Sequence, residues 1–246
     1  NRLAGNPFRW IETSHGIGRT KFLLACRDAH IVVFAPMADR DIYDHAKEVN
    51  PDLLILNLLD DAAGDIAIAT DDFQGGQLAA RRLYECGHRT HLAVTVPAPE
   101  DGPQHSFCNR AKGFLAEMMF LAPNCRIERW EVPLRRTRNS LPQKLKHKRR
   151  PSAVFATGLY FAKKTAAACS ASGLRIPEDI SLLGFDKPDC TEPPCDSIVF
   201  NPEQIVSWAE FFIMNRPVIK NGAPVHLLLD MKLETHGSVK RLNSTP

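Results

Sequence analysis

The sequence predicts an α/β protein in which parallel sheets are flanked by helices, and three observations support this. Residues 151–186 run through an apolar strand, an Ala-rich helix, a stop at Gly173 and a second apolar strand, which together form one βαβ unit. Residues 52–56 and 66–70 are near-continuous apolar runs, typical of strands covered on both faces. Helical and strand patterns also alternate along the earlier part of the chain, as layered α/β folds require.

The individual elements follow from local patterns. In chain order we expect a helix over 11–22, a strand over 30–35, a helix over 39–48, strands over 52–56 and 66–70, a helix over 75–87 and a strand over 92–96. Asp71 and Asp72 precede the third helix, where they can cap its first turn or contact a ligand, and we favour capping. Gly75 and Gly76 allow that helix to approach a neighbouring backbone closely.

Length and composition set broad limits. A chain of 246 residues can form one large unit or two lobes. Its 24% charged and 44% hydrophobic residues are typical of globular proteins and exclude a disordered or membrane-spanning chain, and no apolar run approaches the ~20 residues of a spanning helix. Because the chain starts at Asn1 and its first residues lack the pattern of a secretion signal, we expect it to be a fragment of a longer protein.

The seven cysteines form no CxxC pair, and an odd number cannot all pair internally. Reduced, buried thiols in a cytoplasmic protein are the simplest account. Cys190 and Cys195 are close enough in sequence for a zinc or redox site, but neither paired histidines nor a second cysteine couple accompanies them. We therefore expect no metal and no cofactor.

One segment is strongly basic. Residues 135–150 hold eight Lys or Arg and no acid, and without these eight the formal net charge would fall from +3 to −5. Such a run could contact nucleic-acid phosphates. It lacks interleaved aromatic residues, and Pro142 limits any helix through it, so we favour a solvated helix and loop.

Several motifs resemble the effector-binding domain of lactose-repressor/galactose-repressor (LacI/GalR) family transcription regulators. The longest runs from RPSAVF at 150–155 to GLRIPEDISLLGFD at 173–186. Shorter matches are DDFQGG at 71–76, the R-x-x-G-F of 110–114, the Q-P crossover pattern at 200–204 and the closing segment 233–239. The resemblance extends over nearly all of the chain from Asn6 and is strongest from Asp71 to Val239.

The resemblance implies a two-lobed, periplasmic-binding-protein-like (type I) fold. The expected lobes are residues 1–71 plus 201–224 and residues 72–200 plus 225–246. A small effector, most simply a sugar, would bind between them and control operator DNA through a headpiece that is absent from this chain, in a homodimer with no membrane partner. The alternative is a periplasmic sugar-binding protein of an ABC importer, which shares the architecture.

Two departures from the family pattern concern the first lobe. The family has an apolar strand before the N-P-F segment at residues 6–8, and only ~15 residues separate Leu56 from Asp71, where the family has a helix and a strand. Either this lobe is abbreviated or residues are missing, and we favour missing residues. A third departure is Gly158-Leu159, which replaces a polar pair that contacts sugar hydroxyls in many members and leaves the effector class open.

Asp186 and Arg110 are the leading ligand-binding candidates. Asp186 ends a predicted strand, and an ionised carboxylate can accept two adjacent sugar hydroxyls. Arg110 offers a planar fork for a ring oxygen and a hydroxyl, or for a carboxylate or phosphate. A turn cap at Asp186 and a solvated Arg110 at a helix start remain the plain alternatives.

Phe8 and Phe155 could stack on the apolar side of a sugar or base, although Phe155 on an apolar strand is more often a core residue. Arg9, beside Phe8, and Gly158 complete the candidate ligand-binding set.

We expect no enzyme activity, because no GxSxG elbow, P-loop, HExxH or local Cys/His pair is present. A Rossmann-like enzyme is the distant third interpretation and would need a glycine-rich phosphate loop.

Overall fold

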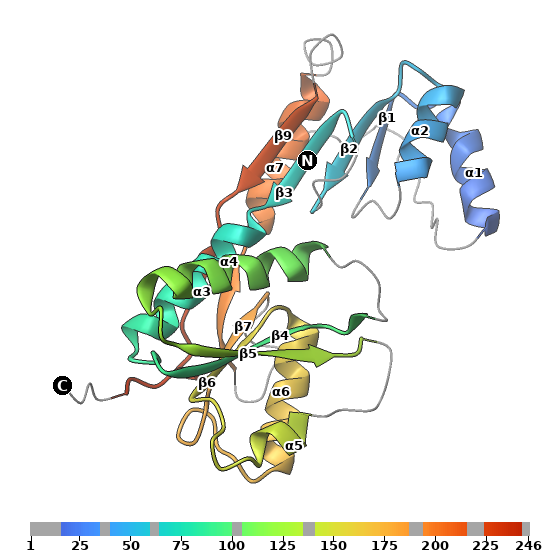
Figure 1. Cartoon of the computed structure of the whole chain (residues 1–246). Helices are drawn as coiled ribbons and strands as arrows, with labels where there is room; N and C mark the ends of the chain where they lie inside the picture. The colour runs from blue at the N-terminus through green and yellow to red at the C-terminus, as the bar shows by residue number, and fades with distance from the viewer. Residues whose placement is uncertain are drawn as a thin grey trace. The chain divides into compact units, whose positions relative to one another are not determined.

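The computed structural model describes residues 16–34, 40–59, 64–99, 105–134, 141–186, 194–215 and 224–242. It divides into two compact units, residues 1–69 with 202–228 and residues 70–201 with 229–246. Each unit is a largely parallel sheet flanked by helices (Figure 1), so the predicted α/β class is confirmed. The sequence placed residues 225–246 in the second lobe, whereas the strand at 225–229 joins the sheet of the first unit.

The first unit has a four-stranded sheet. Its order is β1 (Ile31–Phe34), β2 (Leu54–Leu58), β3 (Ile66–Thr70) and β9 (Val225–Leu229), and both β1 and β3 run parallel to β2. The helices are α1 (Gly16–Cys26), α2 (Arg40–Val49) and α7 (Pro202–Met214). Side chains of α1 and α2 meet the strands in a small core around Phe22, Ile42 and Ile55.

The connection from β2 to β3 is unusually short. Parallel neighbours are normally joined by a crossover of a dozen or more residues. Here Leu56 lies opposite Ile66 in adjacent strands, and only residues 59–65 separate the two strands. Residues 1–15, which include the N-P-F segment and the start of the helix expected over 11–22, lie outside the described part of the chain.

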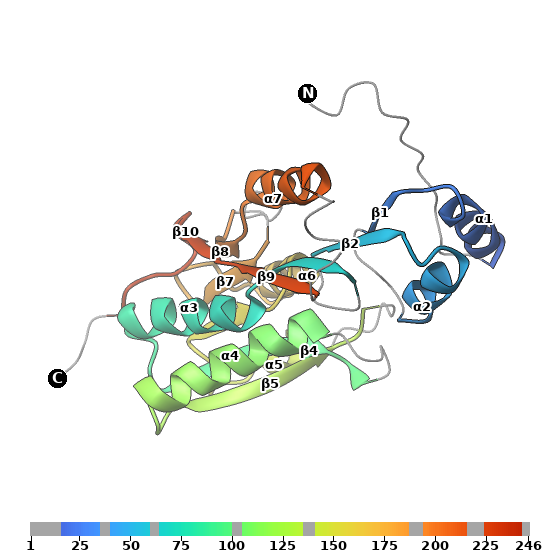
Figure 2. The same cartoon turned by 90° about the horizontal axis from the view of Figure 1, so that it is seen from above.

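The second unit has a six-stranded sheet in the order β10 (Lys232–Glu234), β8 (Asp196–Val199), β7 (Ser181–Phe185), β6 (Ala153–Ala156), β4 (His91–Pro97) and β5 (Arg126–Val132). All pairs are parallel except β10 with β8. The helices α3 (Asp72–Glu85) and α4 (His105–Leu121) cover one face, and α5 (Leu141–Leu145) and α6 (Leu159–Ala171) cover the other (Figure 2).

Strand periodicity divides the core of the second unit into two layers. Val94, Phe155 and Leu183 face α3 and α4, whereas their chain neighbours, such as Val154 and Leu182, face α5 and α6. Because successive strand residues point to opposite faces, a sheet covered on both sides needs an unbroken apolar run. This explains why β6 and β7 were recognisable from sequence.

Candidate functional site

The carboxyl ends of the parallel strands of the second unit meet at one edge of its sheet. Thr157 follows β6 there, and Asp186 follows β7. Thr157 is fully buried and is held by Thr95 of β4, whose hydroxyl accepts the Thr157 N–H at 3.2 Å and whose carbonyl accepts the Thr157 hydroxyl at 2.9 Å. The edge therefore has a fixed backbone from which further contacts are made.

Arg110 is the centre of the polar groups at this edge. It lies in α4 and is 8% exposed. Its Nε donates to Oδ1 of Asp72 at 2.8 Å and its Nη1 donates to the Thr157 carbonyl at 2.9 Å. The guanidinium carbon also lies 3.7 Å from the ring centroid of Phe185, so the cation rests on an aromatic face. These contacts hold the fork in a single orientation.

Asp186 lies beside this guanidinium. Its Oδ2 is 3.7 Å from Nη1 of Arg110, and its side chain is 29% exposed. The residue adopts φ 72°, in the left-handed region that Asp and Asn tolerate better than most residues. Its N–H donates to the Ile198 carbonyl at 2.9 Å, which anchors the turn to β8. Asp186 thus combines an anchored backbone with a carboxylate that remains reachable from solvent.

The two acids at the start of α3 have different roles. Asp71 accepts the Gln74 N–H at 2.9 Å and caps the helix, which confirms the capping prediction for this residue. Asp72 instead forms the ion pair with Arg110, and its side chain is 12% exposed. Sequence reasoning treated the two acids together and missed this division, which depends on a contact between residues 38 positions apart.

Two glycines bring α3 and α4 into direct backbone contact and so set the position of Arg110. A Cβ on Gly76 would lie 2.0 Å from the Arg110 carbonyl oxygen, and a Cβ on Gly113 would lie 2.0 Å from the Phe73 carbonyl oxygen. The close approach predicted for the DDFQGG segment is therefore made by Gly76. At Gly75 an added Cβ would meet the Phe185 ring instead, at 2.9 Å.

The remaining candidates have different surroundings. Phe155 is fully buried and its ring stacks on Phe114 at 5.0 Å between centroids, so its expected role as a stacking face for a ligand is replaced by a core role. Gly158 is the N-cap residue of α6, and an added Cβ would lie 2.7 Å from the Phe107 ring. Phe8 and Arg9 lie outside the described residues. Phe107 and Phe185 are the aromatic residues that contact the guanidinium of Arg110.

The arrangement can bind a polar ligand. One guanidinium, two carboxylates and two aromatic rings offer hydrogen-bond acceptors, donors and apolar faces within a small space. Among the described residues, no group of three His, Cys, Asp or Glu could hold a metal ion. The six described cysteines form no disulfide, and Cys190 lies outside the described range.

The comparisons with known proteins bear on the family and the fold. The family model described as periplasmic binding protein-like domain matches residues 80–216, more than half of the sequence. The chain belongs to this family. Its fold is accordingly the two-lobed, type I periplasmic-binding-protein-like fold that the motifs predicted, and the resemblance to LacI/GalR regulators is confirmed at the level of domain and fold.

Individual relatives are transcription regulators. The HTH-type transcriptional repressor PurR of Escherichia coli O1:K1 / APEC is 32% identical over 123 residues, which are 49% of this chain and 35% of the repressor. The chain thus matches about a third of the length of this curated relative.

Solved structures share the fold. A LacI family regulator from Enterococcus faecalis V583 with bound ribose has a TM-score of 0.71 and 22% identity, covering 94% of this chain and 85% of that chain. A periplasmic binding protein/LacI transcriptional regulator from Alkaliphilus metalliredigens QYMF, complexed with D-xylulofuranose, has a TM-score of 0.67 and 21% identity, covering 91% of this chain and 83% of that chain.

Within the part of the chain that the structure describes, no helix combines the length and apolarity needed to cross a bilayer.

Proposed function

We propose that this chain is the ligand-sensing domain of a DNA-binding transcriptional regulator and not an enzyme, and that it binds a neutral sugar or sugar derivative. The observation that carries the proposal is the Arg110 guanidinium, which lies on Phe185 between Asp72 and Asp186 at the carboxyl edge of the sheet. The names of the relatives support the regulatory role over the periplasmic importer alternative, and the sugars bound in similar folds support the ligand class.

The charges at the site favour a neutral ligand. Asp72 and Asp186 together outweigh the single guanidinium, so a sugar acid or sugar phosphate would meet an excess of negative charge. Sugar hydroxyls can instead donate to the exposed oxygen atoms of Asp186, in charge-assisted bonds that are stronger than neutral ones. Arg110 would act mainly by fixing the two carboxylates, because its Nε and Nη1 already donate to protein acceptors.

Control of operator DNA is the further part of the proposal. A ligand that binds one conformation of the domain more tightly increases the population of that conformation. By thermodynamic linkage, the ligand then changes the affinity of the protein for operator DNA by the same factor by which operator DNA changes its affinity for the ligand. The DNA contacts would come from a headpiece outside this chain, in a cytoplasmic protein. Operator affinity of the longer protein, measured with and without saturating ligand, tests this step.

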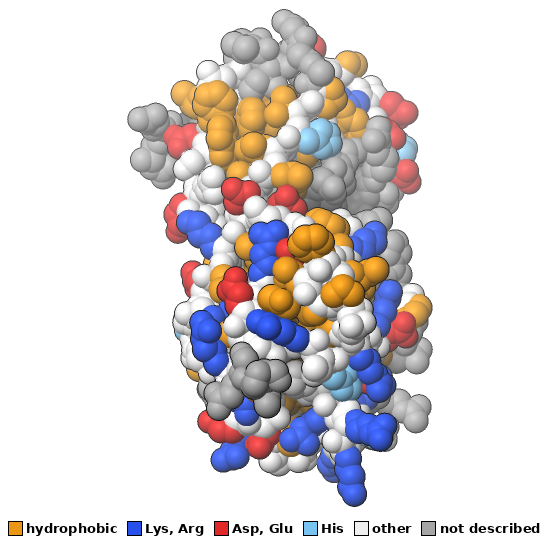
Figure 3. Space-filling model, turned by 60° about the vertical axis from the view of Figure 1, so that its left-hand side comes forward, with side chains coloured by type: hydrophobic (Ala, Val, Ile, Leu, Met, Phe, Trp, Pro, Cys, Tyr) orange, Lys and Arg blue, Asp and Glu red, His pale blue; other side chains and the backbone are white. Residues whose placement is uncertain are grey.

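We also propose that the functional protein is a homodimer. Hydrophobic side chains gather on one face of each unit (Figure 3), and α7 exposes Val206, Phe211 and Met214 at 64%, 50% and 58%. Exposed apolar patches of this kind mark interaction surfaces in soluble proteins. Sedimentation equilibrium across a range of concentrations should give twice the chain mass. A constant monomer mass at every concentration would contradict the proposal for this domain.

The ligand proposal is tested by thermal unfolding of the chain with neutral pentoses, hexoses and disaccharides, beginning with ribose, and with the matching sugar phosphates. A ligand that binds only the folded state raises Tm by mass action. We expect a neutral sugar to raise Tm and its phosphate to do so less. The variant Asp186→Asn should lose the shift, because it removes the charge while keeping a residue that tolerates positive φ.

Asp179→Asn is the matched control, since it removes one carboxylate that lies before β7 rather than after it and pairs with Arg175. It should retain the full ligand shift. A sugar that stabilises wild type and Asp186→Asn equally would contradict the role of Asp186. Preferential stabilisation by sugar phosphates would contradict the neutral-ligand proposal.

A further inference from the structure

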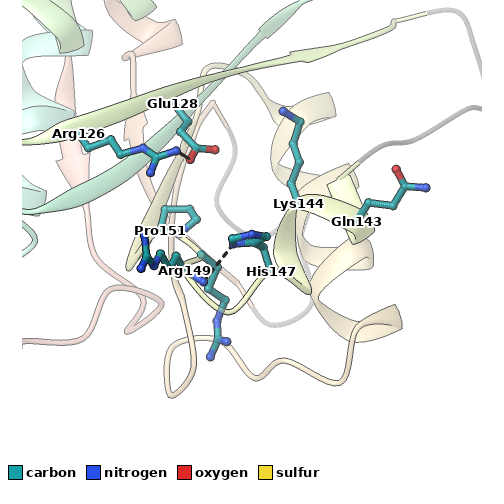
Figure 4. Close-up of a pocket in the computed structure, with 8 residues that line it drawn as sticks. Arg126, Glu128, Gln143, Lys144, His147, Arg149 and Pro151 are labelled. Atoms are coloured by element: carbon teal, nitrogen blue, oxygen red, sulfur yellow. Dashed lines mark hydrogen bonds and ion pairs between the residues drawn. The ribbon is translucent and has the colours of Figure 1, made fainter.

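A polar hollow lies in the second unit, away from the residues discussed above. It has a volume of about 330 Å³ and is lined by Arg126, Glu128, Gln143, Lys144, His147, Arg149, Arg150 and Pro151. Arg126 and Glu128 enter it from β5, and Lys144 and His147 enter it from α5 and the turn that follows (Figure 4). The sequence had shown only that residues 135–150 are basic, not that part of this segment faces a cavity.

The topology separates this hollow from the proposed effector site. Arg126 begins β5, and Pro151 lies two residues before β6, so both lie at the amino edge of the parallel sheet. Thr157 and Asp186 lie at the carboxyl edge of the same sheet. At about 3.3 Å per strand residue, the six positions from Pro151 to Thr157 place the two edges roughly 20 Å apart. One small ligand cannot contact both.

The lining carries a strong excess of positive charge. It contains four permanent cations, Arg126, Lys144, Arg149 and Arg150, with the single carboxylate of Glu128 and the titratable His147. Within the described residues, no ion pair involves Lys144 or Arg149, and the Arg150 charge acts on Asp179 without a direct ion pair. Like charges gathered around one concavity repel one another, and an anion in the hollow would relieve that repulsion.

Glu128 does not neutralise the hollow, because its oxygens are already engaged. Oε1 of Glu128 accepts from Arg126 Nη2 at 2.7 Å and lies 3.0 Å from His91 Nε2, and Oε2 accepts from Trp130 Nε1 at 3.0 Å. The Trp130 bond, followed by His91 and Arg126, lowers the pKa of Glu128 below its ordinary value. The carboxylate thus serves to hold Arg126 at the rim and leaves the charges of the other cations uncompensated.

The turn after α5 presents further donors. Nδ1 of His147 accepts the backbone N–H of Arg149 at 3.1 Å, which places the proton of the neutral ring on Nε2. The His147 carbonyl accepts the Arg150 N–H at 3.1 Å. These two hydrogen bonds fix the turn, so that the side chains of His147, Arg149 and Arg150 all extend from one hydrogen-bonded segment. Lys144, whose ammonium lies 5.8 Å from the Trp130 ring centroid, completes the set.

We propose that this hollow binds a small phosphorylated molecule at a site separate from the effector site. Phosphate oxygens match a mixed set of guanidinium, ammonium and imidazole donors. The volume is at the lower end of the range for small-molecule pockets, which fits a compact phosphate ester or pyrophosphate. The inference does not depend on the identity of the effector.

Isothermal titration calorimetry of the whole chain with sodium pyrophosphate, and separately with inorganic phosphate, tests the proposal. The variant Lys144→Gln/Arg149→Gln should weaken pyrophosphate binding about tenfold or more, because it removes two of the four permanent cations that line the hollow. The control Arg129→Gln/Lys163→Gln removes two exposed cations that do not line the hollow and should bind within about twofold of wild type. Thermal unfolding verifies that both variants are folded.

Three results would overturn the proposal. If neither pyrophosphate nor phosphate binds in a saturable way, the hollow is not an anion site. If the test and control variants lose affinity equally, the binding reflects the overall charge of the chain. If duplex DNA bound through Lys144 and Arg149 while pyrophosphate failed to compete, the surface would be a nucleic-acid contact instead. Loss of ribose or other sugar stabilisation in Asp186→Asn, with pyrophosphate binding intact, would show that the two sites are independent.

Discussion

Asp186 shows how one residue carries both a backbone and a side-chain requirement. Its φ of 72° is tolerated by Asn and Gly but is strained for Ala. Its carboxylate lies 3.7 Å from Arg110 and is the part that we propose contacts ligand. Substitutions that keep or lose these two properties separately can therefore distinguish folding from binding.

At this residue, Asp186→Ala should lower the free energy of unfolding by about 1 kcal/mol more than Asp186→Asn, because Ala lacks the tolerance for positive φ. Urea unfolding at neutral pH measures the difference. Both variants should lose ligand binding. Equal stability of the two variants would show that the turn adjusts at no cost.

His88 is a fully buried histidine whose two ring nitrogens contact Ser152 Oγ at 2.9 Å and the Lys240 carbonyl at 3.1 Å. Burial, as the largest cause, lowers its pKa below the ordinary 6.5. The unfolded chain therefore binds the proton at higher pH than the native protein. The stability that His88 contributes is complete above about pH 6.5 and is lost as the pH falls toward the lower native pKa.

We expect the free energy of unfolding to fall below pH 6.5 and this fall to become shallower in His88→Gln. The change His226→Gln, at an exposed position on β9, serves as the comparison and should keep the wild-type slope. Denaturant unfolding at several pH values provides the measurement. A slope unchanged by His88→Gln would assign the pH dependence to other groups.

At the scale of elements, the contact between α3 and α4 depends on two glycines, which have no side chain to separate the helices. Gly76 and Gly113 each face a backbone carbonyl of the other helix, where a Cβ would approach to 2.0 Å. Neither helix can relieve this by a rotamer change, because the opposing atoms are backbone. The helix pair that positions Asp72 and Arg110 thus relies on glycine at both positions.

The substitution Gly76→Ala should lower the free energy of unfolding by about 1–3 kcal/mol through overpacking, and it should also weaken ligand binding by displacing Arg110. Gly173→Ala is a useful comparison, since Gly173 has φ 70° but nothing within 4 Å of an added Cβ. That variant should pay only the backbone strain of about 1 kcal/mol and keep its ligand affinity. Equal ligand affinity in both variants would contradict the positioning role of Gly76.

At the scale of the whole molecule, the chain passes between the two units near residues 69, 201 and 228, so each unit is assembled from distant segments. Asp196 ties two of these segments together in the second unit. It is fully buried, pairs with Arg82 at 3.0 Å, and its Oδ1 accepts the backbone N–H groups of residues 236, 237 and 238 at 2.8–3.1 Å. The closing segment is thereby fastened to the sheet.

Asp196→Asn should lower the free energy of unfolding by about 3–5 kcal/mol, because it leaves Arg82 without its buried charged partner and puts an NH2 donor where a carboxylate oxygen accepted hydrogen bonds. Asp230→Asn, at an exposed position, should cost about 0–1 kcal/mol. Chemical denaturation of the two variants gives the comparison. Similar small losses in both would show that the closing segment is held by its other contacts.

The sequence by itself determined the α/β class, the βαβ unit of residues 151–186, the capping acid Asp71 and the positions of Arg110 and Asp186 near strand and helix ends. These follow from local periodicity, turn residues and motif resemblance. It did not reveal β5, whose sequence RIERWEV mixes charged and apolar residues and so lacks a continuous apolar run.

Only the tertiary structure decided which aromatic residue contacts Arg110, which acid pairs with it, and that basic residues gather around a hollow. Phe155 and Phe185 both occupy apolar strands, yet Phe114 covers the first and the Arg110 guanidinium covers the second. The physical reason is that strand periodicity fixes the face to which a side chain points, whereas its neighbours there come from helices far away in sequence.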